Sequence, residues 1–186
     1  MEALSQTMTA HERAHVVQLL RDSEMEYLSC IEDLSEAQWS WKPASDRWSV
    51  GETAEHIVLA ETMLLAVVQR AIERSADPDW ATKTAGKNEL LEREMPDRGQ
   101  KATAPERVRP QGLSKEEVIR RFKEVRANTL KFARETQVPL KQHTGEHPFP
   151  IFKTLNAYQW LLYIPLHNRR HHQQIAEVKA TPGYPG

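Results

Sequence analysis

The sequence is poor in glycine, in cysteine and in long apolar runs, and each shortage excludes a class of protein. Glycine occurs only 7 times in 186 residues, and strand-like alternation of apolar and polar residues is hard to find. The single cysteine, Cys30, cannot form a disulfide within the chain, so we expect a cytoplasmic protein whose thiol packs as a small hydrophobe rather than acting as a nucleophile. No apolar run approaches the ~20 residues that span a bilayer, and no signal peptide is recognisable, which argues against a membrane protein.

The charge is nearly balanced, with a formal net charge of -1. Such a chain has no global field to attract nucleic acid or an anionic membrane. Hydrophobic residues make up 39% and charged residues 27%, which is typical of a globular protein rather than a disordered one. The sequence therefore predicts one domain, residues 1–186, that binds neither nucleic acid nor membrane.

Apolar periodicity of 3.6 residues predicts four long helices, over about 9–33, 50–75, 115–135 and 155–180. Ser49 with Glu52 and Ser114 with Glu117 have the spacing of capping boxes before the second and third helices, and Thr154 is placed to cap the fourth. The stretch 77–112 is polar and contains several prolines, with one short helical piece expected at 88–93; connections this long are usually functional or mobile. The pattern predicts an all-α bundle.

His167 and His171 lie four residues apart on the predicted fourth helix. Residues at this spacing share a face, with Cβ atoms about 5–6 Å apart, so both imidazoles can reach one cation at about 2.0–2.1 Å. Trp160 and Ile164 precede them on the same line and Gln174 follows, which places the pair on the core-facing stripe. The alternative is a polar helix surface, which the run HNRRHH favours.

A third histidine, His56, lies on the apolar line of the second helix, beside Leu59 and Met63. A single buried histidine is usually a hydrogen-bonded core residue, because unsatisfied ring nitrogens carry a desolvation cost. Three histidines on the inward faces of two helices are hard to satisfy without a metal ion. We therefore predict a divalent ion held by His56, His167 and His171 with one coordination position open. Imidazole ligands suit zinc, nickel, copper and iron, of which we favour zinc or nickel.

The outer ring nitrogens of such ligands need hydrogen-bond acceptors, for which the candidates are backbone carbonyls, Glu52 and Gln174. No general base stands out, and the possible groups are Glu52, Glu55, Glu61 and His147. Pro165, two residues before His167, either bends the helix to aim the histidine pair or is tolerated as curvature.

Other polar and aromatic residues have both a functional and a structural interpretation. His143 and His147 precede the fourth helix and either reach the metal or form a surface pair, which we favour. The three tryptophans before the second helix either line a pocket or pack on the bundle end, which we favour: Trp39, Trp41 and Trp48. Arg169 and Arg170 either bind an anionic substrate or are solvated.

Two motifs together carry a resemblance to a known family. Pro43 and Trp48 precede the helix that bears His56, and the later helix has the pattern H-x-x-x-H followed by Q-I, here from His167 to Ile175. In order and separation these motifs resemble the DinB-like superfamily, which includes YfiT-type metal-dependent hydrolases and bacillithiol transferases. The resemblance covers nearly the whole chain and is weakest over 77–112.

The resemblance implies a four-helix bundle of up-down-down-up topology, with a long crossover between the second and third helices. It implies that His56, His167 and His171 are the metal ligands, since each matches a family ligand position, and that the protein is a homodimer. Family activities include transfer of low-molecular-weight thiols such as bacillithiol or mycothiol, which makes a thiol one candidate cosubstrate.

We therefore expect a hydrolase or a thiol S-transferase whose metal ion activates a nucleophile against a small electrophilic molecule. The alternative is a non-catalytic metal-binding protein, in which the ion joins two helices or senses a ligand. A fourth protein ligand or a filled cavity would favour the alternative.

Overall fold

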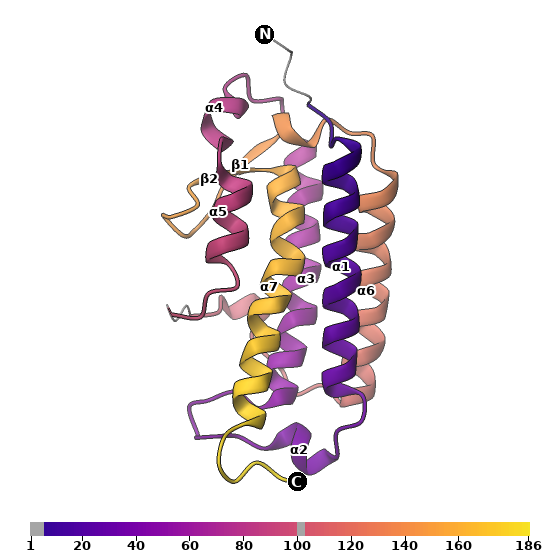
Figure 1. The fold of residues 1–186 in the computed structure, drawn as a ribbon, viewed down its shortest axis with the longest axis vertical. Coiled ribbons are helices and arrows are strands. Elements are labelled where there is room, and N and C mark those ends of the chain that lie inside the picture. The colour runs from indigo at the N-terminus through magenta and orange to yellow at the C-terminus, as the bar shows by residue number, and fades with distance from the viewer. Residues whose placement is uncertain (1–5, 100–102) are drawn as a thin grey trace.

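Four long helices form the body of the molecule in the computed structural model, which describes residues 6–99 and 103–186 (Figure 1). They are α1 (Ala10–Ile31), α3 (Val50–Ile72), α6 (Lys115–Glu135) and α7 (Ala157–Lys179). All four were predicted within a few residues, and the mostly helical fold class is confirmed. No described helix is both long enough and apolar enough to cross a bilayer.

Side-chain caps fix where these helices begin. Ser49 and Glu52 form the predicted capping box at α3, in which each side chain accepts from the other residue's backbone N–H. The box predicted at α6 is only half formed. The Glu117 N–H donates to Ser114 Oγ, but the Glu117 carboxylate accepts from arginine side chains of the next turn instead.

The cap predicted for α7 was wrong. The helix begins at Ala157 behind the N-cap Asn156, whose side chain forms a capping box with Gln159. Thr154 instead begins strand β2 (Thr154–Asn156), which pairs antiparallel with β1 (Thr144–Glu146). Strands of three residues are too short to produce a periodic signal, so the sequence did not reveal this hairpin.

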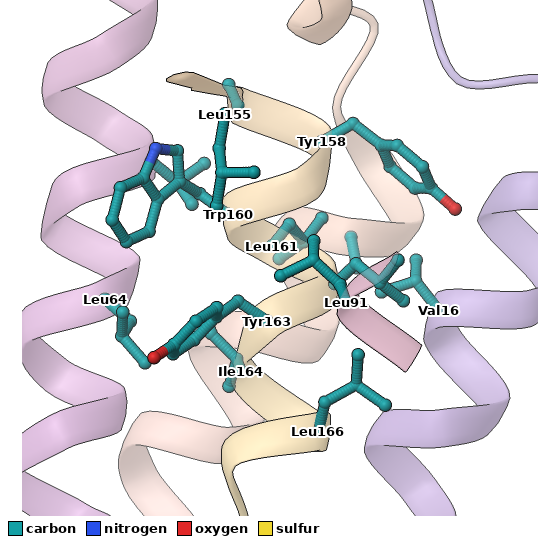
Figure 2. Packing of buried hydrophobic residues seen from close by; sticks show 14 of the residues in the cluster. Val16, Leu64, Leu91, Leu155, Tyr158, Trp160, Leu161, Tyr163, Ile164 and Leu166 are labelled. Atoms are coloured by element: carbon teal, nitrogen blue, oxygen red, sulfur yellow. The ribbon is translucent and has the colours of Figure 1, made fainter. Parts of the chain in front are cut away.

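The crossover between α3 and α6 contains more structure than its polar composition indicated. The predicted piece at 88–93 is α5 (Lys87–Glu94), and α4 (Trp80–Thr84) precedes it within the crossover. Another short helix, α2 (Glu36–Ser40), lies outside the crossover, between α1 and α3. A 3-10 turn, η1 (Glu106–Val108), lies further along. Figure 2 shows Leu91 of α5 packed against the side chains of α7, which fixes the crossover to the bundle.

Hydrogen bonds between helix ends show how the helices run. Arg13, at the start of α1, donates to the Ala133 carbonyl near the end of α6, and Lys115, at the start of α6, donates to the Leu34 carbonyl beyond α1. These two helices are therefore antiparallel. Helices α3 and α6 run side by side in the same direction, which the long crossover permits (Figure 1).

Apolar side chains of all four helices fill the interior. Around α7 they include Leu64, Leu161, Ile164 and Leu166 (Figure 2), and burying each contributes about 1.5–3 kcal/mol. Cys30 is half-buried, its thiol donates to the Tyr27 carbonyl, and burial raises its pKa to about 11. This is the environment of an inert packed thiol.

One ion pair lies entirely inside the bundle. The Arg126 guanidinium, which is fully buried, donates to both carboxylate oxygens of Glu61 at 2.9 and 2.7 Å. It also donates to the Leu20 carbonyl and to Ser23 Oγ, so one side chain of α6 links α3 and α1. Neither residue was expected in this role from the sequence, in which Glu61 was a candidate general base.

Candidate metal centre

The three predicted histidines meet in the interior of the bundle. His56 comes from α3, and His167 and His171 come from α7 one turn apart. The ring centroids are 5.3 Å apart for His56 and His167, and 4.5 Å apart for each of the other two pairs. One nitrogen of each ring lies within 4.8 Å of the others, so the group could hold a metal ion.

The outward nitrogens are hydrogen-bonded in the manner of metal ligands. His56 Nδ1 lies 2.8 Å from the Val108 carbonyl of η1, and His171 Nδ1 lies 2.9 Å from Gln174 Oε1. Both partners only accept, so each Nδ1 carries the proton and each Nε2 keeps a lone pair. The predicted acceptors Gln174 and a backbone carbonyl are therefore present.

The inward nitrogens of His167 and His171 lie close together. His171 Nε2 lies 3.2 Å from His167 Nε2. Burial lowers the pKa of His56, lowers that of His171 to about 3, and together with the neighbouring imidazoles lowers that of His167 well below its usual value. Neutral rings whose inward nitrogens converge fit a divalent cation.

Glu52 does not serve as an acceptor for these rings, contrary to one of our expectations. Its Oε2 accepts from the Ser49 N–H, which completes the cap of α3, and its Oε1 pairs with Lys42 at 2.9 Å.

Glu55, the neighbour of His56, is occupied in a different way. Its buried carboxylate accepts three backbone N–H groups in succession, from Gln111, Gly112 and Leu113. This clamp holds the end of the crossover against α3, close to the segment that supplies the Val108 carbonyl. Glu55 and the ion-paired Glu61 are thus engaged in structural contacts.

Arg98, which the sequence did not single out, contacts the hydrogen-bond partner of His171. Arg98 in the crossover donates to Gln174 Oε1 at 3.2 Å and grips both oxygens of Glu177 at 2.7 and 2.8 Å. Arg98 therefore orients the acceptor of a candidate ligand. Nothing in the sequence pairs residues 76 positions apart, so this contact could not be predicted.

The interpretation of His143 and His147 as a surface pair was wrong, because both are 8% exposed. His143 Nδ1 lies 3.0 Å from the Arg74 carbonyl. The His147 ring stacks on Trp160, with centroids 4.9 Å apart, and burial lowers its pKa to about 4. Phe149 and Phe152, which follow His147 closely in the sequence and contact its ring, were the available signal.

Tyr163 connects this aromatic group to the candidate centre. Its ring lies 5.2 Å from His147 and stacks at 5.9 Å on His167. On the other side, Trp48 lies 5.0 Å from the ring of His56. The histidines are thus bounded by aromatic rings.

For the tryptophans and arginines, the functional and the structural interpretation were both open. Trp39 and Trp41 pack at the bundle end as expected, Trp39 so closely on Gly51 that a Cβ there would lie 2.5 Å from its ring. Arg169 faces Asp22 of α1 at 3.9 Å. Arg170 donates to the Met95 carbonyl, and its charge contributes to the lowered pKa values of His167 and His171.

Within residues 6–99 and 103–186, no cysteine, acidic residue or further histidine joins the group. A donor set of three imidazoles leaves a coordination position for a small molecule. The fold and the site together define a helical bundle with a three-histidine centre able to hold a metal ion.

The chain belongs to the DinB superfamily, whose model matches residues 19–175 and so includes all three histidines. A curated relative is the uncharacterised protein YuaE of Bacillus subtilis (strain 168), 23% identical over 168 residues that make up 87% of this chain and 95% of YuaE. A solved structure with the same fold is YfiT from Bacillus subtilis, described as a probable metal-dependent hydrolase with an unusual four-helix bundle topology. It is 11% identical, with a TM-score of 0.58 over 96% of this chain and 92% of YfiT.

Proposed function

We propose that this protein is a cytoplasmic metal-dependent enzyme of one domain. In it, His56, His167 and His171 hold a zinc or nickel ion that activates a water or a low-molecular-weight thiol against a small electrophilic molecule. The observation that carries the proposal is the convergence of three neutral imidazoles, two of them fixed from outside by Val108 and Gln174. Such an ion supplies Lewis acidity and lowers the pKa of a bound nucleophile.

The residues around the histidines favour an ion that takes part in a reaction over an ion that only joins two helices. No fourth protein ligand is present among the described residues. The aromatic rings of Trp48 and Tyr163 flank the histidines. The parallel course of α3 and α6 supports the up-down-down-up order that the family resemblance implies.

Metal analysis tests the ligand set. The purified protein should contain about one tightly held zinc or nickel ion at this centre, and His167→Ala or His171→Ala should lose it, because two imidazoles remain. His172→Ala is the matched control, since His172 lies on the same helix but faces Glu26 at 3.7 Å. Equal metal content in all three variants would contradict the proposal. Incubation of metal-loaded protein with an electrophile, with and without a panel of thiols, then separates hydrolysis from thiol transfer.

We also propose that two copies associate through a groove of about 910 Å³ between α3 and α6. The α6 wall carries Arg121, Glu124, Lys131 and Glu135 at helical spacing around Asn128. A two-fold axis next to Asn128, on the side of Ala127, would set α6 against its copy in antiparallel fashion. Arg121 would then face the copy's Glu135, and Glu124 the copy's Lys131, so the surface is complementary to itself.

Charge reversal tests this face. Glu124→Lys should shift the protein from dimer to monomer in analytical ultracentrifugation, because Lys131 of the copy would then meet a like charge. Adding Lys131→Glu should restore the dimer. A wild-type protein that sediments as a monomer at ~100 µM, a concentration far above the Kd of a standard interface, would contradict the proposal.

A further inference from the structure

A second group of imidazole and carboxylate side chains lies outside the three-histidine centre, near the start of α1. His11 and His15 stand one turn apart on α1, with rings parallel to within 8° and centroids 6.4 Å apart. Facing them on α5 are Glu89 and Glu92, three residues apart, and His15 Nε2 already lies 2.7 Å from Glu92 Oε1. Two imidazoles and two carboxylates thus line opposite walls of one groove.

The groove has a volume of about 270 Å³ and is floored by Tyr158 of α7. Burial raises the pKa of Tyr158, and the negative charges of Glu12, Glu92 and Glu89 contribute to the rise, so these carboxylates lie around the floor. Glu12 is engaged by Lys141 at 2.7 Å. Among the ion pairs of the described part of the chain, neither Glu89 nor Glu92 has a lysine or arginine partner.

We infer that this groove is a second divalent-cation site, in which His11, His15, Glu89 and Glu92 take a zinc ion. Zinc accepts mixed nitrogen and carboxylate ligands in tetrahedral geometry, and residues spaced by three or four on a helix direct their side chains to one point. His15 is part-exposed and His11 is exposed, so rotamer changes that bring the ligands together occur within nanoseconds. The ion would displace the proton that the His15–Glu92 pair shares.

A zinc ion in this groove would restrain the crossover. An ion held from both walls would fasten α5 to α1. Helix α5 belongs to the crossover that also supplies Arg98, the partner of Gln174. Zinc in the groove would therefore hold in place the segment that orients His171, while the groove itself shares no residue with the three-histidine centre.

Zinc titration of the metal-free full-length chain against a chromophoric chelator tests the site. Wild type should bind about two ions, His15→Ala about one, His167→Ala about one, and the double variant none. His172→Ala, another surface histidine beside a glutamate, should keep both. In the His167→Ala variant, zinc should also slow tryptic cleavage at Lys87 and Arg93 of α5, and adding His15→Ala should abolish that protection.

The two sites can fail separately. If His167→Ala binds no zinc, or if His15→Ala binds as much as wild type, the second site is refuted whatever the first site does. If wild type binds one ion and His15→Ala binds none, the groove is occupied and the three-histidine proposal fails instead.

Discussion

Replacing Arg126 by alanine should lower the free energy of unfolding by about 3–5 kcal/mol, the range seen when one partner of a buried ion pair is removed. Glu61 is 2% exposed and would keep a carboxylate without its bidentate donor. The Leu20 carbonyl and Ser23 Oγ would also lose a donor, so α1 and α3 would both lose a link to α6. Urea denaturation followed by circular dichroism measures the change.

A paired replacement shows whether the cost comes from the orphaned charge. Glu61→Leu combined with Arg126→Met fills the space with apolar groups, and buried pairs replaced in this way are often neutral or stabilising. The double variant should therefore be more stable than Arg126→Ala alone. If it is equally unstable, packing rather than charge determines the loss.

Glu55→Ala should weaken metal binding by about tenfold or more, the effect typical of losing an outer partner of a ligand, because Glu55 holds the segment that carries the Val108 carbonyl, the partner of His56. The three N–H groups that Glu55 accepts would lose their partner, at a cost of about 1–3 kcal/mol each where water cannot replace it. The crossover would then be freer to leave α3, and the Val108 carbonyl that fixes His56 would move with it. Chelator competition measures the affinity, and thermal unfolding measures the stability.

Glu52→Ala is the matched control, because Glu52 lies one turn earlier on α3 and its carboxylate serves the cap. It should cost about 1 kcal/mol of stability, as a lost cap does, with little change in metal affinity. Equal losses of affinity in both variants would show that α3 itself, rather than the crossover clamp, governs His56.

The sequence predicted the helices and the histidines because both follow from local periodicity. Ser49 with Glu52 and the spacing of His167 and His171 are readable within one or two turns of helix. The partners that orient the rings are not local: Val108 is 52 residues from His56. A backbone carbonyl carries no side-chain signature, so only the docking of the crossover could reveal it.

The difference between local patterns and contacts distant in sequence also explains two wrong predictions. Thr154 and Asn156 are both good caps, but pairing with β1 keeps the backbone extended from Thr154 to Asn156, so the helix begins only after Asn156. His147 was assigned to the surface because it lies in a loop, but the aromatic rings of Trp160 and Tyr163 enclose it. In both cases the local sequence allowed the alternative that the structure shows. Contacts between residues distant in sequence selected it.

The crossover has a further consequence for how quickly an ion could come and go. The histidines stand on two long core helices, whose opening requires most of the global unfolding free energy, whereas the Val108 carbonyl and Arg98 stand on a segment of short elements with few buried residues. Segments of that kind open locally at a much lower free energy than the core. Exchange of the ion would thus follow the rate at which the crossover lifts, and the bundle would remain folded throughout.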